Sequence, residues 1–308
     1  INDTIPPQFI KMTPASNNYI YGKQPFSVVS NDNVGVAKTA LYYSTDPEAP
    51  LESWTLIDEH NGSSYSQNID TTVMTNGVVY VVAKIYDAVG NFTYSPKQRY
   101  MCDNQGPEQV KNVKCIAVDG TTATLSWSDV SDDDISYFVV ECKQSDGVWK
   151  SVSRTSTNLG VNLSGLTPEH DYVYRVIGYD KRSNRGTPSE EITVTTLKDT
   201  ICPKVTKITP DPGYFKSEIN LRFTAEDDYR VKSIEIQTST DKESWKTVSE
   251  IKATGESAKC TFDCKLDLKN YEEGSVFVRA KVYDSYGNVT EDKDLTCYEY
   301  VVDRTAPI

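Results

Sequence analysis

The sequence predicts an all-β chain that folds as three tandem antiparallel β-sandwiches. Its 308 residues exceed what a single hydrophobic core usually holds. A short motif recurs along the chain at intervals of 96 to 104 residues, and such a period indicates repeated modules. Apolar and polar residues alternate in many short runs, and no segment has a sustained helical period.

The repeated motif is Asp-x-x-x-Pro. Its copies are Asp3–Pro7, Asp103–Pro107, Asp199–Pro203 and Asp303–Pro307. A proline fixes φ and removes a hydrogen-bond donor, as suits an extended segment that leads into an edge strand. The copies predict modules at residues 1–103, 104–198 and 199–303, and a further module that starts in 304–308. We therefore expect the chain to be a length of a longer array.

Three more markers recur in the same order in each module, so chance is a poor explanation for them. They are a Tyr-Asp-x-x-(Gly/Ser)-Asn sequence at 86–91, 179–184 and 283–288, a tryptophan at Trp54, Trp149 and Trp245, and an acidic or amide pair at Asp32-Asn33, Asp133-Asp134 and Asp227-Asp228.

A strongly alternating stretch precedes each Tyr-Asp pair, and period two predicts a half-buried strand. The residues on one face are Val79, Val81, Ala83 and Ile85 in the first module, Tyr172, Tyr174, Val176 and Gly178 in the second, and Val276, Val278, Ala280 and Val282 in the third. In the middle module, turn signals bound seven runs, at 111–118, 122–128, 137–144, 149–154, 160–164, 171–180 and 190–196. About seven short strands per module is typical of a sandwich.

Composition and charge restrict the partners of the chain. Of its residues, 38% are hydrophobic and 25% are charged, with a formal net charge of −12, which is typical of a globular chain. Nucleic acid and anionic membranes would repel such a chain, so neither is expected as a partner. Because no apolar run approaches the roughly 20 residues that span a bilayer, we expect no membrane insertion. A diffusely acidic surface suits either a cation partner or simple solubility.

Seven cysteines, an odd number, occur without a repeated spacing. Cys260 and Cys264 would lie on one strand about 13 Å apart, at about 3.3 Å per residue, which is too far for a disulfide. We expect most of the seven to be free, buried thiols.

The middle module resembles a fibronectin type III domain over residues 107–197. Trp127 lies in the second predicted strand, where that family buries a tryptophan. The run Gly165–Pro168 followed by Tyr172 resembles the tyrosine corner of the family. The resemblance implies that the Tyr172 hydroxyl bonds back to the main chain.

The flanking modules lack both features and resemble the bacterial Ig-like domains of large surface proteins. They open with the Asp-x-x-x-Pro motif and carry Asp-x-x-Gly-Asn late in the fold. Residues 32–36 (Asp-Asn-Val-Gly-Val) also fit that family, whereas 227–231 lack the glycine. The resemblances imply three tandem immunoglobulin-like and fibronectin type III sandwiches in an extracellular or cell-surface bacterial protein. Five Asn-x-Ser/Thr sequons leave a glycosylated eukaryotic receptor as the alternative.

We expect no enzymatic activity and name no catalytic or cofactor-binding residue. The two histidines, His60 in a loop-like stretch and His170 in the corner turn, belong to different modules. No nucleophile elbow, zinc-protease motif or phosphate-binding loop is present in the sequence. No cofactor is required by this interpretation.

Calcium is the one ligand for which the sequence offers a pattern. In a seven-strand sandwich the incoming segment, the loop after the second strand and the loop after the sixth meet at one pole, and acidic residues occupy all three places in each module. They are Asp3, Asp32 and Asp87; Asp103, Asp133, Asp134 and Asp180; and Asp199, Asp227, Asp228 and Asp284. Calcium takes six to eight oxygen ligands, largely carboxylates and carbonyls. The alternative is that these aspartates satisfy turn backbones through Asx-turns.

The function that we expect is a non-catalytic spacer or stalk, whose partners are the neighbouring modules of its parent chain. The alternatives are an adhesin or carbohydrate-binding segment, which would contact a host or cell-surface glycan or protein, and an accessory region of a multidomain glycan-degrading enzyme. Trp54, Trp149 and Trp245 suit either a sugar-stacking patch or packing against a sheet edge.

Overall fold

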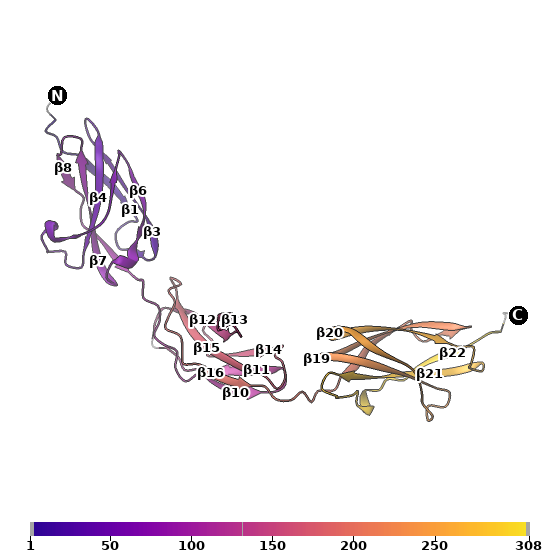
Figure 1. The fold of residues 1–308 in the computed structure, drawn as a ribbon. Helices are drawn as coiled ribbons and strands as arrows, with labels where there is room; N and C mark the ends of the chain where they lie inside the picture. Colours follow the sequence, from indigo (N-terminus) through magenta and orange to yellow (C-terminus); the bar gives the residue numbers. More distant parts are fainter. Residues whose placement is uncertain (1–2, 131, 306–308) are drawn as a thin grey trace. The chain divides into compact units, whose positions relative to one another are not determined.

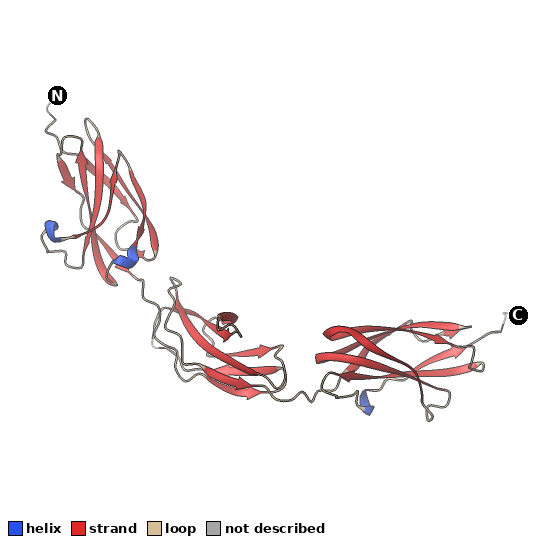
Figure 2. Cartoon of the chain, in the orientation of Figure 1, coloured by secondary structure: helices blue, strands red, loops and turns tan. Residues whose placement is uncertain are grey.

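The computed structural model describes residues 3–130 and 132–305, which form β-strands with three short 3-10 helices (Figures 1 and 2). The copy of the motif at Asp303–Pro307 ends outside these residues. Contacts divide the chain into two compact units, residues 1–110 with 130–139 and 177–189, and residues 111–129 with 140–176 and 190–308. The expected tandem β-sandwich class is confirmed. None of the helices in the described residues is long and apolar enough to cross a membrane.

The first sandwich pairs a three-stranded sheet with a larger one. The smaller sheet has the order β1 (Gln8–Thr13), β3 (Lys23–Asn31), β6 (Tyr65–Asp70). The larger has the order β2 (Tyr19–Ile20), β9 (Gln98–Cys102), β7 (Gly77–Asp87), β4 (Val36–Ser44), β5 (Thr55–Asn61), with β8 (Phe92–Tyr94) on β7. The helices η1 (Leu51–Ser53) and η2 (Thr71–Val73) lie in connections. The incoming segment leads into β1, which is an edge strand as predicted.

The core of the first sandwich lies between these sheets. The predicted face of β7 is confirmed, since Val79, Val81, Ala83 and Ile85 are all fully buried. These residues belong to one apolar cluster with Phe26 and Tyr100, whose rings meet edge to face at 5.6 Å. The Tyr100 hydroxyl donates a hydrogen bond to the Pro14 carbonyl at 2.6 Å. The polar group of this buried side chain is therefore satisfied.

The middle stretch has seven strands, close to the predicted ranges. They are β10 (Lys114–Val118), β11 (Thr122–Ser126), β12 (Ile135–Lys143), β13 (Trp149–Thr155), β14 (Gly160–Ser164), β15 (Asp171–Asp180) and β16 (Ile192–Thr195). They form sheets of order β10-β11-β14 and β13-β12-β15-β16. Trp127 is buried, and the Tyr172 hydroxyl accepts a hydrogen bond from the Thr167 amide at 2.8 Å. Both implications of the fibronectin resemblance are therefore confirmed.

The third stretch departs from the expected seven short strands. Its elements are β17 (Lys204–Thr209), β18 (Tyr214–Phe215), β19 (Glu218–Ser239), β20 (Lys246–Asp267), β21 (Gly274–Asp284), η3 (Asp292–Asp294) and β22 (Tyr298–Val302). Two strands of 22 residues, β19 and β20, pair along most of their length. The early part of β19 also pairs with β17 and its later part with β21, with register shifts between Glu226 and Ser233.

The difference from the first sandwich lies at one corner. Between β3 and β4 the chain turns through Gly35 at φ +150°, a conformation that side chains rarely adopt. In the third sandwich Arg230 occupies the corresponding place and stays within β19. β19 therefore continues as one strand at the place where the first sandwich has two separate strands, β3 and β4.

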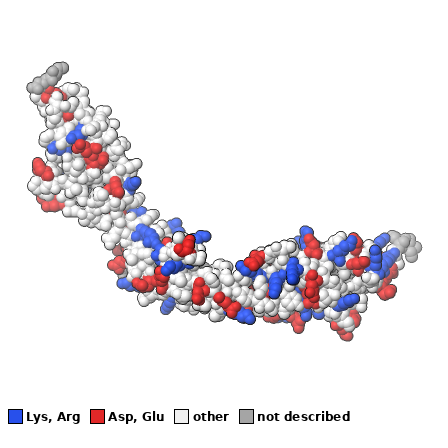
Figure 3. Space-filling model, viewed as in Figure 1, with Lys and Arg blue, Asp and Glu red and all other residues white. Residues whose placement is uncertain are grey.

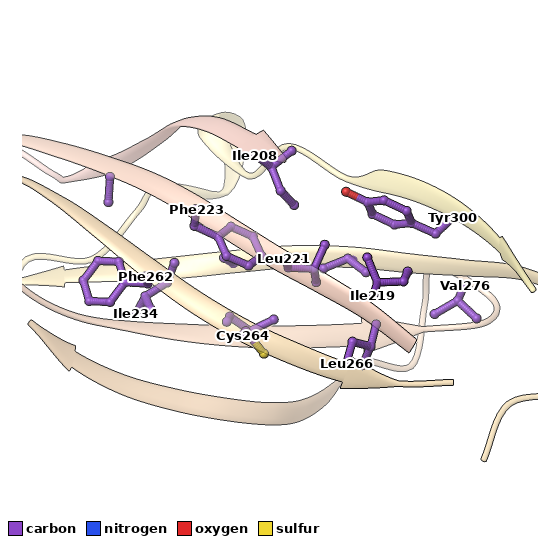
Figure 4. Close-up of a cluster of buried hydrophobic side chains, with 14 of the residues drawn as sticks. Ile208, Ile219, Leu221, Phe223, Ile234, Phe262, Cys264, Leu266, Val276 and Tyr300 are labelled. Carbon is purple, nitrogen blue, oxygen red and sulfur yellow. The ribbon is translucent and has the colours of Figure 1, made fainter. Parts of the chain in front are cut away.

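The core of the third sandwich is formed largely by the long strands (Figure 4). Leu221 and Phe223 of β19 lie beside Phe262 and Leu266 of β20, with Tyr300 of β22 closing one side. The predicted face of β21 is confirmed, because its residues are buried. They are Val276, Val278, Ala280 and Val282.

All seven cysteines are free. Cys102, Cys142 and Cys264 are buried, whereas Cys297 is exposed and the other three are half-buried. The expectation that most are buried is therefore wrong, because several lie near sheet edges or in loops. Cys260 and Cys264 do share β20.

Candidate metal centres at the sandwich poles

Three aspartates converge at one pole of the first sandwich, which we call the first pole. Asp3 belongs to the incoming segment, Asp32 to the turn after β3, and Asp87 to the end of β7. One carboxylate oxygen from each lies within 4.8 Å of the other two. The prediction that these three places meet is thus realised in the fold, and cation binding stays a prediction.

The side chain of Asp87 is held by the loop that follows it. Its Oδ1 accepts from the amides of Val89, Gly90 and Asn91 at 2.7 to 2.9 Å, and its Oδ2 accepts from Asn91 Nδ2 at 2.6 Å. Burial alone would raise the pKa of Asp87, but these hydrogen bonds outweigh it and lower the pKa below its ordinary value. Asp87 therefore performs the Asx-turn role that was the alternative to calcium.

The same asparagine also holds the incoming segment. Asn91 Nδ2 donates to the Asp3 carbonyl at 3.1 Å. At the other two poles Asn184 donates to the Asp103 carbonyl at 3.0 Å and Asn288 to the Asp199 carbonyl at 3.2 Å. We call this repeated arrangement the asparagine clasp. It gives a physical reason for the Tyr-Asp-x-x-(Gly/Ser)-Asn marker.

Two oxygens of the first pole have no hydrogen-bond partner among the residues that the structure describes. Asp32 Oδ2 accepts from the amides of Val34 and Gly35, both at 2.9 Å, but its Oδ1 accepts from nothing. Asp3 Oδ1 accepts from the Ile5 amide at 3.1 Å, while its Oδ2 is likewise unpartnered. In both Asp3 and Asp32, hydrogen bonds within the turn thus engage one carboxylate oxygen and leave the other without a donor.

The third pole repeats this pattern with deeper burial. Asp199, Asp227 and Asp284 bring carboxylate oxygens within 4.8 Å of one another, and Asp199 and Asp284 are each 1% exposed. Within the described part of the chain, Asp199 Oδ2 and Asp227 Oδ1 have no hydrogen-bond partner. Burial, with smaller contributions from neighbouring aspartates, raises the pKa of Asp227 to about 6 and raises that of Asp199 too. Burial therefore disfavours the charged forms of Asp199 and Asp227.

The second pole contains an internal cation. Asp103, Asp134 and Asp180 converge as at the other poles, and Arg182 lies among them. Its Nε is 3.1 Å from Asp103 Oδ2 and its Nη1 is 2.7 Å from Asp134 Oδ2. The guanidinium carbon also lies 3.6 Å from the centre of the Tyr19 ring. No sequence pattern predicts Arg182 as a member of the site.

Two of the predicted residues lie outside the clusters. Asp228 Oδ2 accepts from Thr121 Oγ1 at 2.9 Å. The carbonyl of Asp133 accepts from Lys181 Nζ at 3.2 Å. In each acidic pair only one member belongs to the cluster.

The histidines and tryptophans have structural surroundings. His60 lies in β5, paired with Thr39, so its expected loop position is wrong. His170 packs edge to face on Tyr172. The Trp149 and Trp245 rings are each covered by an arginine guanidinium, Arg175 and Arg279, at 4.0 Å. Trp54 is buried. These contacts favour packing over an open sugar-stacking patch.

Comparisons identify a family in the middle of the chain. Residues 108–195 match the family model of the fibronectin type III domain. No curated protein matches the chain. A human domain of this type, from KIAA0970 protein, is 25% identical, covering 30% of this chain and 74% of that one at a TM-score of 0.27. One from human fibronectin type III domain containing protein 3 is 25% identical, covering 32% and 92% at a TM-score of 0.29.

Proposed function

We propose that the chain is a non-catalytic spacer or stalk array of a large extracellular or cell-surface bacterial protein. The asparagine clasp carries this proposal. In all three sandwiches the loop after the strand that ends in Asp87, Asp180 or Asp284 binds the incoming segment rather than standing free. Loops are where sandwich domains usually carry binding functions, so their use to fix the chain favours a mechanical role.

Two further observations support the spacer. Fibronectin type III domains, of which residues 108–195 are one, serve as structural or binding modules. Positive and negative side chains are interspersed over the face seen in Figure 3, an arrangement suited to solubility rather than to steering one charged ligand. Structural calcium at the poles and neighbouring modules of the parent chain as partners belong to the same proposal.

A ligand-binding screen tests the spacer. The full chain is applied to glycan arrays and to cells, with folding checked by circular dichroism. We expect no saturable binding, because the pole loops are engaged within the chain. Saturable binding that disappears with a single surface substitution would reject the spacer in favour of an adhesin.

One surface favours the alternative of a carbohydrate-binding segment. On β7 and β8, Tyr86, Phe92 and Tyr94 surround the Lys84 ammonium, which lies 4.1 Å from the centre of the Phe92 ring. Phe92 is 46% exposed, and exposed aromatic rings can stack on sugars. If the screen finds a glycan, Phe92→Ala should abolish binding, whereas Val89→Ala, another exposed apolar residue, should not. An accessory region of a glycan-degrading enzyme is compatible with either result of the screen, glycan binding or its absence.

A further inference from the structure

We propose that the third pole binds a divalent cation, whereas at the second pole the Arg182 guanidinium takes the place of that cation. The proposal rests on the structural role of cations in the proposed function and makes it specific to individual poles. It replaces the expectation of equivalent calcium sites in every module.

The second and third poles differ in what surrounds corresponding carboxylate oxygens. Arg182 forms an ion pair with one oxygen of the incoming aspartate, Asp103 Oδ2, and with one oxygen of the turn aspartate, Asp134 Oδ2. At the third pole the incoming and turn aspartates are Asp199 and Asp227. Each of them has one buried oxygen without a partner. The two oxygens that lack a partner at the third pole thus belong to the aspartates that correspond to the two with which the guanidinium forms ion pairs at the second pole.

At the third pole, burial makes it energetically costly for the carboxylates to lack a positively charged partner. Asp199 is 1% exposed, so water cannot readily solvate its unpartnered Oδ2, and a buried charge without a partner is strongly disfavoured. The position that holds Arg182 is two residues after Asp180. The residue two after Asp284 is Tyr286, whose hydroxyl donates to the Pro168 carbonyl at 3.1 Å. No side chain of the described residues forms an ion pair with Asp199, Asp227 or Asp284.

The chemistry of the ligands defines the class of cation. The third pole offers three carboxylates and neither thiol nor imidazole. Hard divalent cations such as calcium prefer oxygen ligands of this kind, with water completing the coordination. Three converging negative charges favour a divalent over a monovalent ion, because like charges so close repel one another until they are neutralised.

Reciprocal substitutions test the assignment. Calcium ions bound per full-length chain are counted by isothermal titration calorimetry after treatment with a chelator. Tyr286→Arg places a guanidinium at the third pole and should lose one ion, as should Asp227→Asn. Arg182→Val, which gives the second pole the residue found at position 89, should gain one ion. Arg222→Val removes an exposed arginine that pairs with Asp263 and should leave the count unchanged.

Either of two results overturns the inference: a wild-type chain that binds no calcium, or a count that Asp227→Asn and Arg182→Val leave unchanged. Circular dichroism checks each variant, and the opposite signs expected of loss and gain keep the test decisive if one substitution unfolds the chain. A negative result in this calcium-binding experiment does not contradict the spacer function, because that proposal is tested by the ligand-binding screen. Conversely, a glycan ligand would reject the spacer without changing the ion count.

Discussion

Asn288 illustrates how one side chain connects parts of the chain that are distant in sequence. Its Nδ2 donates to Asp284 Oδ2 at 2.6 Å and to the Asp199 carbonyl at 3.2 Å. Both aspartates are almost completely buried. An aspartate and an asparagine four residues apart thereby fix a loop and the segment that enters the sandwich.

Asn288→Ala should lower the free energy of unfolding by about 1–3 kcal/mol, because it leaves buried acceptors without a donor. Urea denaturation, followed by far-UV circular dichroism, measures the change. Asn270→Ala is the matched control, since Asn270 is exposed, and should change stability by less than about 0.5 kcal/mol. Equal stability of the two variants would show that water replaces the clasp without cost.

Arg182 shows where residue-scale prediction from sequence ends. Convergence of the aspartates follows from strand order, because a sandwich brings particular loops to one end. The conformation of the long Arg182 side chain depends on its ion-pair partners Asp103 and Asp134, which are distant from it in sequence. Lys181 and Arg182 are adjacent basic residues in one loop, and only Arg182 bridges two aspartates of the pole.

At the scale of the strand, β19 carries the core of the third sandwich. Leu221 is 1% exposed and lies in a cluster with Phe223, Phe262 and Cys264. The cluster includes residues of both long strands and of β21 and β22 (Figure 4). The packing of this strand therefore determines the stability of the sandwich as a whole.

Leu221→Ala should destabilise the third sandwich by about 2–5 kcal/mol, through lost burial and the cavity left behind. The measurement is the midpoint of urea unfolding in the full chain. Val248→Ala on β20 is the control, because Val248 is 36% exposed and deletion of its methyl groups should cost much less. A similar loss for both variants would contradict the assigned core.

The strands of the middle sandwich could be predicted within about three residues because turn residues bound each alternating run. The long strands β19 and β20 could not. The acidic pair at 227–228 predicts a loop, but the stretch lacks the glycine that marks the corner in the first sandwich, and the strand passes it with register shifts instead of ending. Similarly, the sequence shows Trp149 and Trp245 at repeated positions, but the arginines that cover them lie on β15 and β21, distant in sequence.

At the scale of the whole molecule, the first and third sandwiches have separate cores. The apolar cluster of the first draws on residues 9–102, and that of the third on residues 205–302. Among the described residues, neither cluster includes one from the middle sandwich. A self-contained core is the main requirement for independent folding. We therefore expect the module that starts near residue 199 to fold without the rest of the chain.

A fragment of residues 199–305 should fold by itself and unfold in one cooperative transition, measured by far-UV circular dichroism during heating. Its midpoint should lie somewhat below that of the same transition in the full chain, because Thr121 and Pro168, which bond to Asp228 and Tyr286, are absent. Each such bond contributes about 1 kcal/mol. Tyr286→Phe provides the control, since it should lower the midpoint in the full chain and leave the fragment unchanged. A fragment without a cooperative transition would refute a separate third module and place its stability in contacts with residues 111–176.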